Sequence, residues 1–217
     1  MSMSDIEIPL FPLDVVLFPG TALPLHIFEA RYRSLITDCQ RDHMPFGVVL
    51  AKPESVYLEE EPFSVGTMAV IHNLERLPDD RYTLMAVGTQ RFRIVELHRT
   101  TPYLSGVVEL LYDDAEPDEM LYPPMTQANS LFLRYLNMVL ECMNEEGNTV
   151  ALPELPEDLS YFIAYFLEIQ NEVKQHLLEL TSTRQRLQEE IEILRREVPF
   201  MRQILSKEIS EERCMLN

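Results

Sequence analysis

Residue types that perform acid–base or nucleophilic chemistry are thinly spread along this chain. No GxSxG turn is present to expose a nucleophilic serine, and no HExxH helix is present to bind zinc. A lone histidine is more often a structural or surface residue than a proton carrier or a ligand. The five histidines all stand singly: His26, His43, His72, His98 and His176. The sequence therefore offers no candidate catalytic residue, although a triad built from distant positions would leave no such motif.

Phosphate and metal sites lack a sequence motif as well. There is no GxxxxGK(S/T) loop to cradle the phosphates of ATP. Cys39, Cys142 and Cys214 are far apart, and an odd number of cysteines without a CxxC pair argues against a disulfide framework and a zinc site. We therefore expect no cofactor, no bound metal and no enzyme activity. A hydrolase whose triad is assembled by the fold is the alternative.

The charge balance is strongly acidic. Asp and Glu number 36 against 18 Lys and Arg, which gives a net charge of -18 and a pI near 4.6. Such a surface repels phosphate backbones, and arginines come together only in short pairs, such as Arg91 with Arg93 and Arg195 with Arg196. We therefore expect no nucleic-acid partner. The charge either serves solubility or favours basic partners.

Targeting and membrane signals are missing from the sequence. The amino-terminal residues MSMSDIEIPL contain no basic region followed by a long apolar run, so a signal peptide is not expected. No apolar run approaches the roughly 20 residues that a membrane helix needs. We expect a cytoplasmic protein that makes no contact with membranes.

The segment from Ile8 to Cys39 changes its periodicity halfway. Prolines at positions 9, 12, 19 and 24 divide its first part into short apolar runs, which favour short extended strands over a helix. The sharpest turn is Phe18-Pro19-Gly20, because Gly20 tolerates a positive φ. Apolar residues then recur at helical spacing, which predicts one amphipathic helix: Phe28, Tyr32, Leu35, Ile36 and Cys39.

Short strands separated by turns follow this helix. Apolar or alternating runs predict strands at residues 45–50, 65–77, 82–87, 90–97 and 103–111. Residues 78–81 form a turn that joins two of them into a hairpin. Gly88 interrupts the pattern and predicts a bulge or a sharp bend, as at a barrel corner. This spacing favours a small β barrel over a fold of alternating strands and helices.

Two long segments of this region resemble a known family. IPLFPLDVVLFPGTALPLHIFEARY and VGTMAVIHNLERLPDDRYTLMAVGTQRFRIVEL are similar to the amino-terminal domain of Lon proteases, which also occurs alone in small bacterial proteins. The resemblance extends over roughly residues 8–198. It implies an α+β fold, a small PUA-like β pseudo-barrel with one inserted helix, followed by an α-helical subdomain. In Lon this domain helps to recognise protein substrates and to assemble the oligomer. The ATPase and Ser-Lys protease modules of Lon have no counterpart in this chain.

The carboxyl-terminal half is predicted to be helical. An acidic linker at residues 113–119 is closed by Pro123-Pro124, and helical periodicity begins at Met125. We therefore divide the chain into a β pseudo-barrel subdomain at residues 5–114 and a helical subdomain at residues 118–217. The long final helix is expected to begin at about residue 182 and to be broken near residue 199, because Pro199 removes a hydrogen bond and clashes with the preceding turn.

The final helix carries a heptad pattern that has two interpretations. Leu187, Ile191 and Leu194 lie at a/d spacing. They would pack either against the helical segment around residues 159–167 or against another chain. In the second case they are candidates for oligomer contacts.

The resemblance favours a non-catalytic protein-binding module over three alternatives. Such a module would bind unfolded or apolar polypeptide segments, and pairing with a free strand edge is one way to do so. The alternatives are an adaptor or homo-oligomer that uses the carboxyl-terminal helices, an RNA-binding PUA-like domain and a hydrolase. The candidates for peptide binding are apolar residues of the first Lon-like segment, each of which would also suit the core: Phe11, Phe18, Pro19, Phe28 and Tyr32.

Overall fold

The computed structural model separates the chain into two compact units. It describes residues 6–52, 61–99, 102–142 and 151–215, with side chains described except for residues 142 and 200–215. Contacts group Met1–Asp113 with Ala164–Thr181, which we call the sheet unit, and Asp114–Ile163 with Ser182–Asn217, which we call the helical unit. The division expected from the sequence, at residues 5–114 and 118–217, had assigned Ala164–Thr181 to the helices. The α+β fold class is confirmed.

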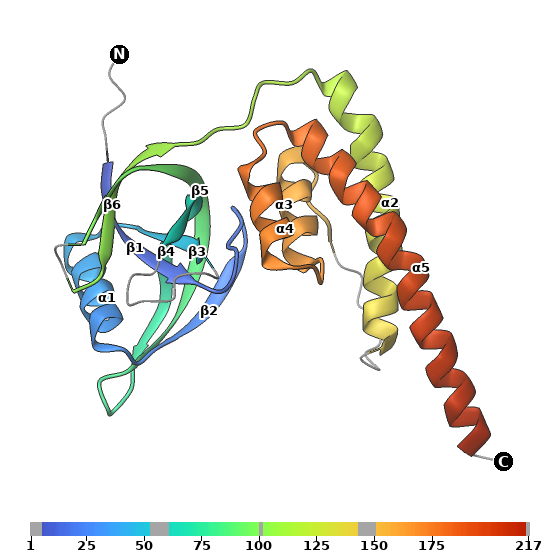
Figure 1. Ribbon diagram of the computed structural model, residues 1–217, viewed down its shortest axis with the longest axis horizontal. Coiled ribbons are helices and arrows are strands. Elements are labelled where there is room, and N and C mark those ends of the chain that lie inside the picture. Colours follow the sequence, from blue (N-terminus) through green and yellow to red (C-terminus); the bar gives the residue numbers. More distant parts are fainter. Residues whose placement is uncertain (1–5, 53–60, 100–101, 143–150, 216–217) are drawn as a thin grey trace. The chain divides into compact units, whose positions relative to one another are not determined.

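The sheet unit contains one six-stranded sheet that closes on itself (Figure 1). The strand order is β2-β5-β4-β3-β1-β6, and β5 also pairs with β6, so that five strands form a ring and β2 is added outside it. All pairs are antiparallel except β1 with β3. The strands are β1 (Ile6–Leu13), β2 (Ala22–Ile27), β3 (Phe46–Ala51), β4 (Pro62–Arg76), β5 (Tyr82–His98) and β6 (Leu104–Leu110).

Strand β5 is continuous where the sequence predicted an interruption at Gly88. The irregularity lies instead in the pairing of β5 with β4, whose register shifts between Thr67 and Ala69, opposite this glycine. The Gly88 N–H donates to the Thr21 carbonyl at 2.9 Å, and its carbonyl accepts from the Gly20 N–H at 3.0 Å. A Cβ at residue 88 would lie 2.3 Å from the Phe18 carbonyl oxygen. Glycine is therefore required because the turn at residues 18–20 crosses β5 at close range.

The predicted amphipathic helix is α1 (Ala30–Asp42). Its buried face consists of Tyr32, Leu35, Ile36 and Cys39, which pack into the larger core cluster of the sheet unit. The helix ends at His43, whose φ of 51° is left-handed and whose backbone N–H donates to the Cys39 carbonyl. Phe28 was predicted on the same helical face, but it precedes the helix and its side chain is exposed.

Helix α4 (Asn171–Glu179) belongs to the sheet unit. Buried polar side chains form hydrogen bonds between the segment of α4 and the strands. The Arg91 guanidinium, on β5, donates to the carbonyls of Leu178 at 2.5 Å and Leu180 at 2.6 Å, and it pairs with Asp113. The Gln175 amide donates to the Val65 carbonyl on β4 at 3.0 Å. A buried arginine must be fully paired, so this segment is required to complete the unit.

The helical unit is built from α2 (Asp118–Cys142), the first eight residues of α3 (Pro156–Phe166) and α5 (Thr183–Met215). Helices α2 and α5 pack side by side (Figure 1). Two boundary predictions are corrected. Helix α2 begins at Asp118 and contains Pro123 and Pro124, and α5 continues through Pro199. Proline has helical φ and removes only its own hydrogen bond, so a long helix with many remaining bonds can contain it at a cost of about 3 kcal/mol.

Candidate functional site

The five predicted peptide-binding residues divide between the core and the surface. Phe11, Phe18 and Tyr32 have exposed fractions of 4%, 0% and 5%. The rings of Phe11 and Tyr32 are 4.0 Å apart, in the core beneath α1. These three side chains are therefore corrected to core residues, since a partner could reach them only after the unit had opened. Pro19 is partly exposed, and Phe28 is 62% exposed.

The predicted oligomer contacts are corrected in the same way. Leu187, Ile191 and Leu194 have exposed fractions of 0%, 4% and 0% inside the helical unit. The heptad pattern serves packing within the chain, where α5 lies against α2. Beside these residues the Arg186 Nε donates to the Ser160 hydroxyl of α3 at 2.7 Å. A second chain cannot use these three side chains without displacing this packing.

A surface that the sequence prediction missed lies on the outer side of strands β2, β5 and β4. In register, Ala22 is opposite Val87 and then Val70, and Pro24 is opposite Met85 and then His72. The intervening residues Leu84 and Ala86 point into the core, so the named residues point outward. We call Ala22, Pro24, Val70, Met85 and Val87 the outer apolar face, and each of them is at least partly exposed.

The outer apolar face left an ambiguous signal in the sequence. Residues on both sides of β5 are apolar in this stretch, which is also the pattern of a strand that is covered on both sides. The neighbouring strand β2 distinguishes the outer side of the sheet from the core side. It alternates between exposed Pro24 and His26 and partly or fully buried Leu25 and Ile27. Phe28 extends the outward series of β2, and its ring lies 6.1 Å from that of His26.

The edge of β2 is largely closed to pairing with another strand. The Tyr165 hydroxyl donates to the Ala22 carbonyl at 3.2 Å, which places this carbonyl on the free edge. Successive residues of an antiparallel strand turn their backbone groups to opposite edges, so Pro24 and His26 share the free edge with Ala22. Pro24 has no N–H to donate. His26 is then the only one of these three whose N–H and carbonyl are both without a described partner.

A cavity of about 360 Å³ adjoins the outer apolar face at Val70. Its walls are Val70, Ile71 and Leu74 of β4 and the end of α1 with the turn after it, from Cys39 to Pro45. Burial, with Asp38 and Asp42 nearby, raises the pKa of the Cys39 thiol to about 12. This thiol is therefore protonated at neutral pH and is not a nucleophile.

The cavity is better suited to binding apolar side chains than to catalysing a reaction. The cavity lining is mostly apolar, and its polar members, Gln40 and His43, stand at the end of α1. Among the described residues, no group of three or more His, Cys, Asp or Glu side chains could hold a metal ion. In the same part of the chain, no helix is long and apolar enough to cross a membrane.

Comparison with known proteins identifies the family. A sequence model of the ATP-dependent protease La (LON) substrate-binding domain matches residues 7–196. The chain belongs to this family. The Lon protease of Anaeromyxobacter dehalogenans is 31% identical over 202 residues, which are 87% of this chain and 23% of that protease. Lon protease 2 of Myxococcus xanthus matches with the same identity and coverage. The chain thus spans about a quarter of the length of these relatives.

Solved Lon domains share the fold. The Lon N-terminal domain protein from Xanthomonas campestris superposes with a TM-score of 0.63 at 26% identity, over 85% of this chain and 96% of that one. The N-terminal domain of the Mycobacterium avium complex Lon protease gives a TM-score of 0.63 at 18% identity, which shows a common fold. The resemblance read from the first two segments of the sequence is confirmed, and it extends into the helices.

Proposed function

We propose that this chain is a non-catalytic protein-binding module that binds unfolded or apolar polypeptide segments on the outer apolar face and in the adjoining cavity. The observation that carries the proposal is the continuity of partly exposed Val70, Met85 and Pro24 with a cavity of about 360 Å³. A substrate-binding domain family makes a polypeptide the natural occupant.

Binding would depend on side chains more than on backbone pairing. Each apolar side chain of the partner that is buried contributes about 1.5–3 kcal/mol, without requiring a particular sequence. The free edge of β2 adds only the few backbone groups left by Tyr165 and Pro24. We therefore expect broad selection for exposed apolar residues, as unfolded chains present them, with a preference for basic segments because of the net charge of -18.

The other candidates have weaker support. An adaptor role would need accessible contact residues, but Leu187, Ile191 and Leu194 are buried. Homo-oligomerisation through this helix face is therefore not proposed. RNA binding is disfavoured by the net charge of -18. Strong, salt-sensitive retention of RNA in a filter-binding assay at low salt would reverse that judgement. Cytoplasmic localisation stays a prediction.

Charge placed on the outer apolar face tests the proposal. The probe is a fluorescein-labelled, reduced and alkylated α-lactalbumin, and binding is followed by fluorescence anisotropy. We expect Met85→Glu to weaken binding by about tenfold or more, since a carboxylate in an apolar contact must be desolvated. Val95→Glu is the matched control, because Val95 is a 60% exposed apolar residue on the same strand. Equal affinities of the two variants, both close to wild type, would refute the proposal.

A further inference from the structure

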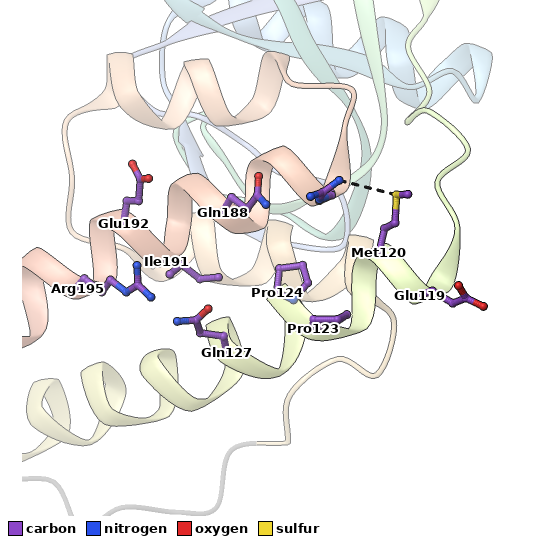
Figure 2. Close-up of a pocket in the computed structure, with 10 residues that line it drawn as sticks. Glu119, Met120, Pro123, Pro124, Gln127, Gln188, Ile191, Glu192 and Arg195 are labelled. Carbon is purple, nitrogen blue, oxygen red and sulfur yellow. Dashed lines mark hydrogen bonds between the residues drawn. The ribbon is translucent and has the colours of Figure 1, made fainter.

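A cavity of about 610 Å³ lies between the start of α2 and the first half of α5 (Figure 2). Of its charged side chains, two are acidic and two are basic, and all are exposed: Glu119, Glu192, Arg184 and Arg195. These charges balance one another, so the cavity favours neither an anionic nor a cationic ligand. Another group of charged side chains, on the sheet unit, is unbalanced, because it places one histidine between two carboxylates.

His98, the last residue of β5, contacts a carboxylate at each of its ring nitrogens. Its Nδ1 lies 3.1 Å from Oε1 of Glu7 on β1, and its Nε2 lies 3.2 Å from Oε1 of Glu96 on β5. The Ser105 hydroxyl on β6 donates to the same Glu7 oxygen at 3.4 Å. We call Glu7, Glu96, His98 and Ser105 the His98 cluster. It connects three neighbouring strands of the ring, since β6 pairs with both β1 and β5.

Both contacts of the imidazole are favourable only in its charged form. A neutral histidine has one N–H donor and one ring nitrogen that accepts, whereas the imidazolium has two donors. In the neutral form, one carboxylate oxygen would face a lone pair instead of a proton. The hydrogen bonds to Glu7 and Glu96 therefore raise the pKa of His98 above its ordinary value. These two carboxylates are the charged groups that act on the ring within the described part of the chain.

The start of β1 has a neighbouring strand on one side. Among the described residues, 6–9 pair with residues 105–108 of β6 alone, because pairing with β3 begins at Leu10. Pro9 has no N–H for this pairing. Ile8, which is 1% exposed, attaches the segment to a core cluster, whereas Ile6 is 36% exposed. Side-chain contacts across β6 therefore add to the few interactions that hold this segment.

Loss of the proton leaves two negative charges on one face of the sheet. Glu7 and Glu96 are both opposite Val107, one on each side, so their backbones are two strand spacings apart, which is about 10 Å. A neutral imidazole keeps a hydrogen bond to only one of the two carboxylates. The start of β1 then depends on its backbone pairing with β6 and on the burial of Ile8.

We propose that protonated His98 holds the start of β1 on β6 and that loss of this proton lets residues 6–8 open locally. The stabilisation is complete below the ordinary histidine pKa of about 6.5, and it is lost as pH rises through the raised pKa. Local opening uncovers the edge of β6 that β1 covers, at residues 106–108. This switch is independent of the proposed function, because none of the four residues of the His98 cluster belongs to the outer apolar face.

Nuclear magnetic resonance between about pH 6 and about pH 9 tests the proposal on the whole chain. The chemical shift of the His98 ring Cε1–H gives its pKa, and amide protection factors, which correct for the intrinsic effect of pH on exchange, report opening at residues 6–8. We expect His98 to titrate above the ordinary histidine value. The protection factors should fall by up to about tenfold per pH unit as the proton is lost. Amides of α1 serve as the internal reference.

Variants separate the charge of the His98 cluster from its packing. His98→Gln, with a neutral amide, should remove the pH dependence of protection at residues 6–8. Glu7→Gln should lower the pKa of His98 and reduce the fall in protection. Glu109→Gln is the matched control, because Glu109 is an exposed carboxylate on β6 that pairs with Arg93 at 3.6 Å. This control should behave like wild type.

Three results would overturn the proposal. If His98 titrates at or below the ordinary histidine value in wild type, its two carboxylate contacts do not favour the charged ring. If protection at residues 6–8 stays constant while His98 loses its proton, the His98 cluster is a surface ion pair without effect on β1. If His98→Gln retains the wild-type fall in protection, another group causes it.

Discussion

Two buried charged residues show opposite solutions to the cost of burial. Arg91 is 1% exposed, and its guanidinium is satisfied by two carbonyls of the α4 segment and by Asp113. Glu190, on α5, is 0% exposed, and neither of its carboxyl oxygens has a hydrogen-bond partner among the described residues. An unpaired buried carboxylate is too costly to persist, so this group stays protonated instead.

The pH dependence of the helical unit should report Glu190. Burial raises the pKa of its carboxyl well above the ordinary value, with Arg186 opposing the shift and Glu189 adding to it. The resulting stability is complete below the ordinary glutamate pKa and is lost as pH rises toward the raised one. As pH rises above the ordinary glutamate pKa, we expect Glu190→Gln to abolish a loss of unfolding free energy of up to about 1.4 kcal/mol per pH unit.

Urea denaturation followed by far-ultraviolet circular dichroism at each pH measures this effect. Glu192→Gln is the matched control, because its side chain is on the same helix and is exposed. The control should retain the wild-type slope with pH. Parallel pH profiles for wild type and Glu190→Gln would mean that the carboxyl is already ionised in the folded protein.

At the scale of elements, prolines inside helices are the feature that sequence rules handled least well. Pro123 and Pro124 were expected to precede a helix, and Pro199 was expected to break one, yet all three lie inside α2 or α5. The rule gives a local cost for each proline, and packing of α2 against α5 supplies a larger stabilisation.

Removal of Pro199 should strengthen α5 locally. Pro199→Ala restores an N–H that can donate to the Arg195 carbonyl, and Pro199 is exposed, so no core contact is lost. We expect local opening around residue 199 to cost about 2–3 kcal/mol more, which slows amide hydrogen exchange there by at least about thirtyfold. Exchange of α1 amides serves as the internal reference. Unchanged exchange near residue 199 would contradict an unbroken helix at this position.

At the scale of the whole molecule, the two units are interleaved along the chain. The sheet unit takes Ala164–Thr181 from between two segments of the helical unit. Arg91 and Gln175 explain why, since each places a buried side-chain hydrogen bond across that junction. The protein therefore cannot be cut once into a barrel and a helical part without leaving buried polar groups unpaired.

A truncated chain tests this interleaving. We expect residues 1–117 alone to be less stable by about 3 kcal/mol or more, because they lose two carbonyl acceptors of Arg91 and the buried side chains of Leu177 and Leu178. The comparison is a chain in which residues 164–181 follow residue 113 through a Gly–Ser linker, and it should recover the loss. Thermal unfolding by circular dichroism measures both. If the two chains unfold at the same temperature, Ala164–Thr181 does not belong to the sheet unit.

Local pattern predicted most of the elements and part of the surface. The strands, the helix α1 and the Lon resemblance followed from periodicity and from two long segments whose residues stand in the expected order. Phe28 was the one predicted binding residue with a largely exposed side chain. Phe11, Phe18 and Tyr32 were placed wrongly because an apolar side chain suits a core and a binding surface equally well, and sequence does not distinguish them.

The sequence by itself determined the fold class, the family and the absence of familiar catalytic motifs, since these depend on residue type and spacing along one segment. The tertiary structure alone decided which apolar residues remain accessible. Met85, Val70 and Pro24 meet only because three strands pair in one register, and Leu187 and Leu194 are buried only because α5 packs on α2. Accessibility depends on contacts between distant residues, and no local pattern encodes those contacts.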